Sequence, residues 1–337
     1  MKKIVVMGAT GFVGWHVCEK LARQGWHITA PVRRLSDAKG ILHLPTLTVM
    51  GADVHDAQAL ARVVEGHEAV VNLVGILHGS LADFEQVHVA LPKKIAHVCA
   101  SAGVQHIVHI SALGADALQP DKLPSLYLRT KGEGEAVLMQ AAVGACADRA
   151  GRAGFDLTIL RPSVVFGDGD QFLSLLARLQ GFLPVLPLAC AEARFQPVWV
   201  EDLATAVVRS LDCNACVTGI AGQSGGSALE SALESALPSP RVIEAVGPDV
   251  FTLRQLAQAA ARMSGMADGR PVMGLPDWAG RLQAMLMGLW PGVPMMSIDN
   301  INSMKVASIA TGHLPTLSAL GIRPTGVQAI ARGFLQP

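Results

Sequence analysis

The stretch Gly8-Ala9-Thr10-Gly11-Phe12-Val13-Gly14 decides the fold of this chain. It follows a short apolar run at residues 4–7 and precedes a segment, 12–24, with helical periodicity. Between a strand and a helix, three glycines permit a tight turn, close approach of backbone N–H groups to a pyrophosphate, and close helix–strand packing. The helix N-terminus adds positive partial charge where phosphates bind. In this setting the triplet predicts a dinucleotide-binding turn, whereas alone it would indicate only a structural turn.

The next two hundred residues alternate short apolar runs with helical patterns. Strands are expected at 27–32, 47–50, 69–74, 106–110 and 157–160, and helices at 56–65, at 84–102 and from Ser125 onward. Continuously apolar runs are typical of strands buried on both faces, and this alternation indicates parallel pairing. We therefore expect an α/β protein with a Rossmann-type doubly wound parallel sheet and a smaller C-terminal α/β substrate lobe.

The sheet domain is expected to span residues 1–165, with 195–211 returning to it as a strand that turns into a helix. The C-terminal lobe would then comprise residues 166–337. Within this lobe, a Pro- and Leu-rich segment predicts a buried loop (181–188), a Gly-, Ser- and Ala-rich segment predicts a flexible insertion (213–240), and Thr252 is a plausible N-cap for a helix ending at Met263.

The composition excludes some classes of partner. Half of the residues are hydrophobic and 16% are charged, and Lys plus Arg balance Asp plus Glu at 27 each. Without a basic excess we expect no nucleic-acid partner. The apolar run at the start is too short for a signal peptide, and no stretch of about 18 uncharged apolar residues predicts a membrane span. We therefore expect a cytoplasmic protein.

The strongly apolar segment 278–290 has two interpretations. The favoured one is an ordinary helix that faces the core. The alternative is a docking surface for a membrane or a partner protein, which would place the chain at the periphery of the inner membrane.

The sequence contains six cysteines, and in a cytoplasmic chain we expect them to be reduced. Cys213 and Cys216 have the spacing of a metal or redox pair. Because no second pair stands nearby to complete about four zinc ligands, no metal site is expected.

Two arginines at the end of the second predicted strand indicate which dinucleotide binds. About 20 residues after the last glycine, such sites carry an acid for a ribose 2′-hydroxyl or an arginine for a 2′-phosphate. Here the chain has Arg33 and Arg34, and its first acid is Asp37. A guanidinium pairs well with a phosphate. NADP(H) is therefore favoured over NAD(H), although two arginines after a strand could also be a solvated loop.

Tyr127 is the single tyrosine, and Lys131 follows it four residues later. On a helix these positions share one face. Lys131 could then hold a nicotinamide ribose while its charge favours the phenolate of Tyr127, whose ordinary pKa near 10 is too high for acid–base work at neutral pH. The alternative is a surface pair on an exposed helix, but the order of elements favours the catalytic interpretation.

Together the glycine turn, the Tyr127–Lys131 pair and the strand order resemble the extended branch of the short-chain dehydrogenase/reductase superfamily. The resemblance implies further cofactor contacts. Asp53 and Val54 match the turn whose acid approaches the adenine, Val74 and Gly75 match the segment beside the cofactor, and Pro162 stands in the Arg-Pro…Gly loop near the nicotinamide.

Within this branch the chain is most similar to the atypical group of the NDUFA-nine-type accessory subunit of respiratory complex I and its bacterial relatives. That resemblance implies a kept Tyr/Lys pair with an incomplete catalytic tetrad. Ser111 is the only hydroxyl after the strand that ends at Ile110, and His88 stands where the superfamily usually has an asparagine.

Two functions are compatible with these features. One is an NADP(H)-dependent oxidoreductase or epimerase-like enzyme, with an apolar carbonyl compound favoured over a sugar nucleotide as its substrate. The other is a non-catalytic NADP(H)-binding assembly or accessory protein. The residues assigned to catalysis are Tyr127, Lys131 and Ser111, and those assigned to cofactor binding are Gly8, Thr10, Gly11, Phe12, Val13, Gly14, Arg33, Arg34, Asp53, Val54, Val74, Gly75, Tyr127, Lys131 and Pro162.

Overall fold

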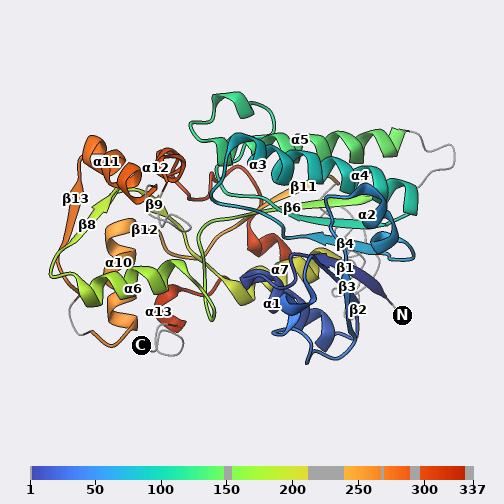
Figure 1. Cartoon of the computed structure of the whole chain (residues 1–337), viewed down its shortest axis with the longest axis horizontal. Helices are drawn as coiled ribbons and strands as arrows, with labels where there is room; N and C mark the ends of the chain where they lie inside the picture. The colour runs from blue at the N-terminus through green and yellow to red at the C-terminus, as the bar shows by residue number, and fades with distance from the viewer. Residues whose placement is uncertain (1, 148–153, 212–238, 267–268, 289–296, 331–337) are drawn as a thin grey trace, which may run out of the picture.

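The structure is a computed structural model that describes residues 2–147, 154–211, 239–266, 269–288 and 297–330. A large parallel sheet with helices on both faces forms one part of the molecule, and a lobe of short strands and helices lies beside it (Figure 1).

The large sheet has seven parallel strands in the order β11-β6-β5-β4-β1-β2-β3. Their bounds are β1 (Lys3–Met7), β2 (His27–Val32), β3 (Leu47–Gly51), β4 (Ala69–Asn72), β5 (His106–Ile110), β6 (Asp156–Pro162) and β11 (Arg241–Ala245). The chain order reverses between β1 and β4, so the carboxyl ends of these strands face the crevice where doubly wound sheets bind ligands. The predicted doubly wound parallel sheet is confirmed.

The seventh strand differs from the predicted domain division. We expected residues 241–245 to belong to the C-terminal lobe, but β11 pairs with β6 in the large sheet, with Val242 opposite Ile159 and Ile243 opposite Leu160. Parallel strands are joined by long crossover connections, so the strand that pairs with β6 can lie far from it in the sequence. The predicted insertion 213–240 lies outside the described residues except for its last two positions.

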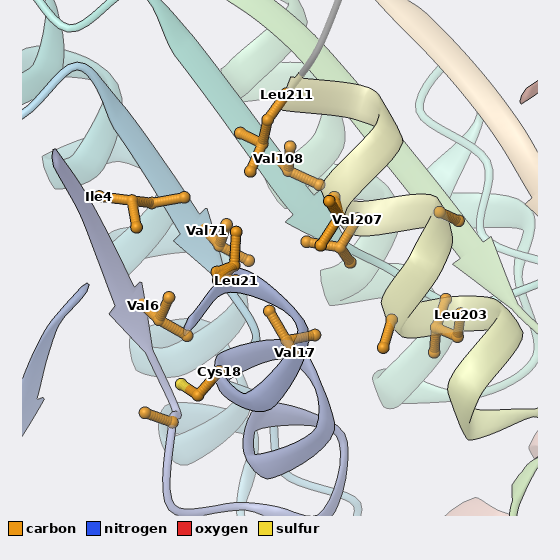
Figure 2. Packing of buried hydrophobic residues seen from close by; sticks show 14 of the residues in the cluster. Ile4, Val6, Val17, Cys18, Leu21, Val71, Val108, Leu203, Val207 and Leu211 are labelled. Atoms are coloured by element: carbon orange, nitrogen blue, oxygen red, sulfur yellow. The ribbon is translucent and has the colours of Figure 1, made fainter. Parts of the chain in front are cut away.

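Helices cover both faces of the sheet (Figure 1). One face carries α2 (Ala57–Val64), α4 (Leu91–Ala102) and α5 (Leu126–Ala147), and α4 continues α3 (Leu81–Glu85) through a π-helical turn, Gln86–Ala90. The other face carries α1 (Phe12–Arg23) and α7 (Val200–Leu211). Figure 2 shows Val17 and Leu21 of α1 and Val207 of α7 packed over Val6 and Val71 of the strands. This aliphatic core holds the glycine turn between β1 and α1 in place.

The lobe is built from short strand pairs and helices. The pairs are β7 (Val165–Phe166) with β10 (Val198–Trp199), β9 (Arg194–Phe195) with β12 (Phe251–Thr252), and β8 (Leu186–Ala189) with β13 (Val272–Leu275). The helices of the lobe are α6 (Phe172–Phe182), α10 (Leu253–Met263), α11 (Asp277–Gly288), α12 (Ile298–Ser303) and α13 (Val327–Ile330). Short 3₁₀ turns on the sheet side of the molecule cover Leu35–Ala38, Pro120–Lys122 and Leu317–Leu320.

Two predictions for the lobe have different outcomes. Thr252 caps α10 as expected, since its side chain accepts from the Gln255 N–H and the Gln255 side chain accepts from the Thr252 N–H. The prediction of a buried loop at 181–188 is wrong. This segment ends α6 with an exposed Phe182 and then enters β8, because pairing with β13 satisfies its backbone.

The helix expected within 278–290 exists as α11, but the core-facing interpretation does not hold for three of its large side chains. Trp278, Leu282 and Met285 are 71%, 46% and 56% exposed, while Gly280 packs closely on Ala189. Among the described residues, none of the helices is both long and apolar enough to cross a membrane.

Candidate functional site

The glycine turn has the close backbone geometry that a phosphate cradle needs. Gly8 has a φ of +83°, which favours glycine, and the Gly11 N–H donates to the Gly8 carbonyl at 3.0 Å. A Cβ added to Gly14 would lie 2.1 Å from the Gly8 oxygen, so α1 approaches the turn too closely for any side chain there. Thr10 and Gly11 are exposed at the start of α1, whose first N–H groups are free to bind an anion.

The two arginines lie at the same edge of the sheet as the turn. Arg33 and Arg34 directly follow β2, which is hydrogen-bonded to β1, and both are exposed. Within the described part of the chain, neither guanidinium has an ion-pair partner of its own. Asp53 and Val54 follow β3, and the Asp53 carboxylate accepts from the His55 N–H at 3.0 Å. The four positions therefore line the edge on which an adenosine half would lie.

Lys131 enters the crevice from α5 and reaches the ends of β4 and β5. It is buried, and its Nζ donates to the Ile110 carbonyl at 3.0 Å. The loop after β4, which includes Val74, passes close to this ammonium, since a Cβ at Gly75 would lie 3.2 Å from the same Nζ. Burial lowers the pKa of Lys131 to about 8, although the buried Glu135 carboxylate opposes this change.

Tyr127 lies one helical turn before Lys131 and contacts two aromatic side chains. Its ring centroid is 5.5 Å from that of His88 and 6.4 Å from that of Phe84, in edge-on arrangements. Burial raises the pKa of Tyr127 to about 12. This differs from the sequence-based expectation that Lys131 lowers it, because the lysine ammonium bonds to the Ile110 carbonyl. The phenol is therefore protonated at neutral pH.

Two buried polar atoms at the end of β5 have no partner among the described residues. These are the Ser111 hydroxyl and Nε2 of His109, two positions earlier on the same side of the extended chain. The His109 Nδ1 accepts from the Asn72 amide at 3.0 Å, which leaves the proton on Nε2. Burial, and then the Lys131 charge, lower the pKa of His109 to about 3. An unpaired hydroxyl and N–H in one place fit a bound polar group.

His88 is a fixed, neutral part of the same cluster. Its Nε2 accepts from the Ile76 N–H at 3.2 Å, so Nδ1 carries the proton and donates to the Thr130 hydroxyl at 3.0 Å. Burial, with the Lys131 charge, lowers the pKa of His88 to about 2. The residue lies in the π-helical turn before α4, a deviation that is frequent at functional sites. It supports Tyr127 and holds the loop after β4.

Pro162 ends β6, next to β5 in the sheet. Its carbonyl accepts from the Leu113 N–H at 2.9 Å and so joins the loops after both strands. Before it, Arg161 forms an ion pair with Glu135 of α5. Sequence reasoning did not single out Asn72, His109 or Thr130, because only strand register and helix packing bring them to the site.

A separate polar cluster joins α1 to α7. His16, Glu19 and Glu201 place possible metal-ligand atoms within 4.8 Å of one another. However, the Glu201 carboxylate pairs with His16 and with Lys20, each at 2.5 Å. This network therefore holds the two helices together beside the glycine turn. Cys18, Cys99 and Cys190 are free thiols, whereas the Cys213–Cys216 pair lies outside the described residues.

The geometry defines a class of protein, an NAD(P)-binding protein of Rossmann type. Comparison with known families supports this class: a model of NAD(P)H-binding domains matches residues 8–173. Curated relatives of the chain indicate more specific similarities. NADH dehydrogenase [ubiquinone] 1 alpha subcomplex subunit 9 of Mus musculus is 27% identical over 96% of this chain and 77% of its own length. Ceramide reductase of Caulobacter vibrioides is 27% identical over 76% of this chain and 77% of its own.

Solved structures share the fold. An NADPH-dependent quinone oxidoreductase of Escherichia coli, complexed with NADPH, has a TM-score of 0.65 at 20% identity and covers 97% of this chain and 98% of its own. A nucleoside-diphosphate-sugar epimerase of Staphylococcus aureus has the same score at 15% identity, over 98% of this chain and all of its own. By these comparisons the chain has an NAD(P)H-binding domain, is similar over most of its length to the subunit 9 group, and shares the fold of extended short-chain dehydrogenase/reductase-like proteins.

Proposed function

We propose that the chain is an NADP(H)-dependent reductase that acts on a carbonyl group of an apolar molecule. The observation that carries this proposal is the position of α5, which brings Tyr127 and Lys131 to the ends of β4 and β5. Lys131 is bonded to Ile110, the residue directly before the unpaired Ser111 hydroxyl. In this proposal Tyr127 is the acid, Lys131 the cation and Ser111 the hydroxyl donor of one site.

The protonation states support reduction as the direction of the reaction. A bound reduced nicotinamide supplies the hydride. Tyr127 is protonated at neutral pH and donates its proton to the carbonyl oxygen, while Ser111 donates a hydrogen bond to the same oxygen. Lys131, held on the Ile110 carbonyl and mostly charged at neutral pH, binds the ribose of the nicotinamide. His88 and Phe84 orient the phenol ring.

The arginines support NADP(H) as the dinucleotide. Arg33 and Arg34 are exposed at the edge of the sheet beside the glycine turn, with no ion pair of their own in the described part of the chain. A guanidinium forms strong bidentate hydrogen bonds to a phosphate. The 2′-phosphate of NADP(H) would bind these two side chains.

The surroundings of the site support an apolar substrate. Leu77 and Leu81, on the segment that leads to Phe84, are 56% and 47% exposed. Such side chains suit a hydrocarbon better than a sugar nucleotide. Ceramide reductase, one of the curated relatives, has by its name an apolar substrate.

The test combines nucleotide titration with a panel of carbonyl compounds. We expect oxidation of NADPH by long-chain ketones or aldehydes, and loss of this activity in Tyr127→Phe and Lys131→Met with unchanged NADPH affinity in Tyr127→Phe. Activity that survives Tyr127→Phe would contradict the assigned acid. Leu81→Ser should raise the KM for the apolar substrate, whereas Leu42→Ser, at an exposed leucine between β2 and β3, should not.

A second candidate function is an accessory protein of a respiratory complex in which the dinucleotide is structural. The exposed Trp278, Leu282 and Met285 of α11 favour it, because large apolar side chains grouped on one helix face commonly mark an interface. The similarity to subunit 9 of NADH dehydrogenase points to a complex of that kind. We expect co-purification with a membrane-bound NADH dehydrogenase, reduced in Trp278→Ser/Leu282→Ser. A wild-type chain absent from that complex would contradict this function.

A further inference from the structure

The first turn of α5 is capped from two distant parts of the chain. Ser125 provides the local cap, since its hydroxyl accepts from the Leu128 N–H at 3.2 Å. Asp299 of α12 provides the second cap. Its carboxylate accepts from the Leu126 N–H at 2.7 Å and from the Tyr127 N–H at 3.0 Å. The lobe therefore supplies hydrogen bonds to the backbone of the proposed catalytic tyrosine itself.

The hydrogen bonds between the Asp299 carboxylate and the first turn of α5 are of a strong kind. The first N–H groups of a helix have no partner within the helix, and the end carries positive partial charge. A carboxylate that accepts two of these N–H groups forms charge-assisted hydrogen bonds. Ser125 and Asp299 together satisfy the N–H groups of residues 126, 127 and 128. Through Asp299, α12 therefore supplies two of these three hydrogen bonds to the turn that carries Tyr127.

Asp299 is itself held firmly by the lobe. The Ser303 hydroxyl donates to the Asp299 carbonyl at 3.0 Å, and Ser297 caps α12 through the Asn300 N–H at 3.1 Å. Ile301, on the same short helix, is buried and lies near the position that a Cβ of Gly280 would occupy. The carboxylate is therefore presented to α5 by a packed unit of the lobe.

The segment after α12 touches the other side of the site. A Cβ added to Gly114 would lie 3.1 Å from the Val306 side chain, so Val306 packs on the loop that follows Ser111. Further on, the Ser308 carbonyl accepts from the Ser163 hydroxyl at 2.8 Å, just after β6. Residues 299–308 therefore contact the elements that carry Tyr127, Ser111 and Pro162.

We propose that Asp299 is a positioning residue that couples the C-terminal lobe to the acid of the site, by fixing the first turn of α5 and with it the ring of Tyr127 against Phe84 and His88. The rate effect that follows from it rests on the proposed reductase function. The effect on the Tyr127 ring does not, because it concerns the protein alone.

The test uses the single tyrosine as a reporter. Protein labelled with ¹³C-tyrosine gives ring signals from Tyr127 only, so no assignment is needed. Asp299→Ala is expected to shift or broaden these signals while NADPH affinity stays within twofold of wild type. Asp56→Ala is the matched control, because it removes an aspartate cap that accepts from Gln58 on α2 and leaves α5 untouched.

Steady-state kinetics of Asp299→Ala should show a change in kcat but little change in KM. Misplacement of a reacting group by about an ångström can cost on the order of 100-fold in rate, so Asp299→Ala should lower kcat roughly 10- to 100-fold with little change in the KM for NADPH. Asp299→Asn keeps one carbonyl oxygen that can accept from an N–H and should recover part of both the rate and the wild-type spectrum.

The outcomes are distinguishable. Tyr127 signals in Asp299→Ala that match wild type would overturn the positioning role, whatever the activity. If Asp299→Ala fails to fold, the same decision rests on Asp299→Asn compared with Asp56→Ala. A wild-type chain that reduces no carbonyl compound, together with shifted Tyr127 signals in Asp299→Ala, would contradict the proposed reductase function and leave the positioning role standing.

Discussion

The carboxylate of Glu135 accepts two hydrogen bonds from the Arg161 guanidinium, at 2.9 and 2.5 Å, with its own side chain fully buried. Glu135 is on α5, one turn after Lys131, and Arg161 is on β6. The pair therefore fixes α5 against the sheet at the point where the lysine enters the site. Since both oxygens are satisfied, the geometry meets the condition for a tolerated buried ion pair.

Removing one partner of this pair should destabilise the fold severely. Arg161→Leu leaves the Glu135 carboxylate buried without its partner, and such changes cost about 3 to 5 kcal/mol. Urea denaturation monitored by tryptophan fluorescence measures the loss. The double variant Glu135→Leu/Arg161→Met should recover most of the stability, because it buries no charge. A single variant as stable as wild type would show that the pair does not hold α5.

The Arg33 side chain should give the protein a higher affinity for NADPH than for NADH. Hydrogen bonds to a charged group contribute about 1.5 to 3 kcal/mol, so Arg33→Ala should weaken NADPH binding roughly 10- to 100-fold. NADH binding should be unchanged, because NADH lacks the 2′-phosphate. Isothermal titration of both dinucleotides measures this, with the exposed Arg62→Ala as control. Equal affinity for NADH and NADPH in wild type would contradict the assignment.

Local signals were sufficient to predict the sheet. Between β1 and α1, the glycine turn, the apolar run before it and the helical periodicity after it all lie within about 20 neighbouring residues. Strand β11 was missed because β6, with which it pairs in the sheet, is about 80 residues earlier in the chain. The buried loop expected at 181–188 failed for the same reason, since β8 pairs with the distant β13.

Residues of the candidate site could likewise be predicted from local spacing but not from distant contacts. Tyr127 and Lys131 could be singled out because their spacing is a property of one helix. Asn72 and His109 face each other only through the register of β4 and β5. Asp299 reaches Tyr127 from 172 positions away, and no periodicity connects the two. The raised pKa of Tyr127 also depends on burial, which the sequence does not specify.

Gly14 should tolerate no side chain. A Cβ there would lie 2.1 Å from the Gly8 carbonyl oxygen, so Gly14→Ala must separate α1 from the turn. We expect loss of dinucleotide binding beyond detection and a lower melting temperature. Gly181→Ala is the control, since nothing lies within 4 Å of the added Cβ and an alanine suits its helix. Retained NADPH binding in Gly14→Ala, measured by titration, would contradict the cradle geometry.

Lys131 should make the protein less stable at neutral pH than a neutral side chain would. Its pKa is about 8 in the folded state and about 10.4 in the unfolded chain, so its protonated form favours unfolding. Between these values the unfolded state binds more protons, and the stability of wild type rises with pH. Lys131→Met should therefore raise the melting temperature at pH 7, with a smaller difference at about pH 10. The activity of this variant should be lost, as in other trade-offs of stability against function. A melting temperature difference that does not change with pH would contradict the lowered pKa.

Tyr127 should titrate well above an ordinary phenol. Burial raises its pKa to about 12, against about 10 in the unfolded chain. Because the chain has one tyrosine, the tyrosinate absorbance band reports this residue alone. We expect a midpoint near 12 in the folded protein and near 10 in urea. The raised pKa contributes stability that is complete below about pH 10 and is lost as the pH rises towards 12, since the unfolded chain deprotonates first. Tyr127→Phe removes the absorbance change and serves as the control. A folded-state midpoint at or below 10 would mean that Lys131 acts on the phenol directly, and it would replace the protonated acid of the proposed reduction with a phenolate base.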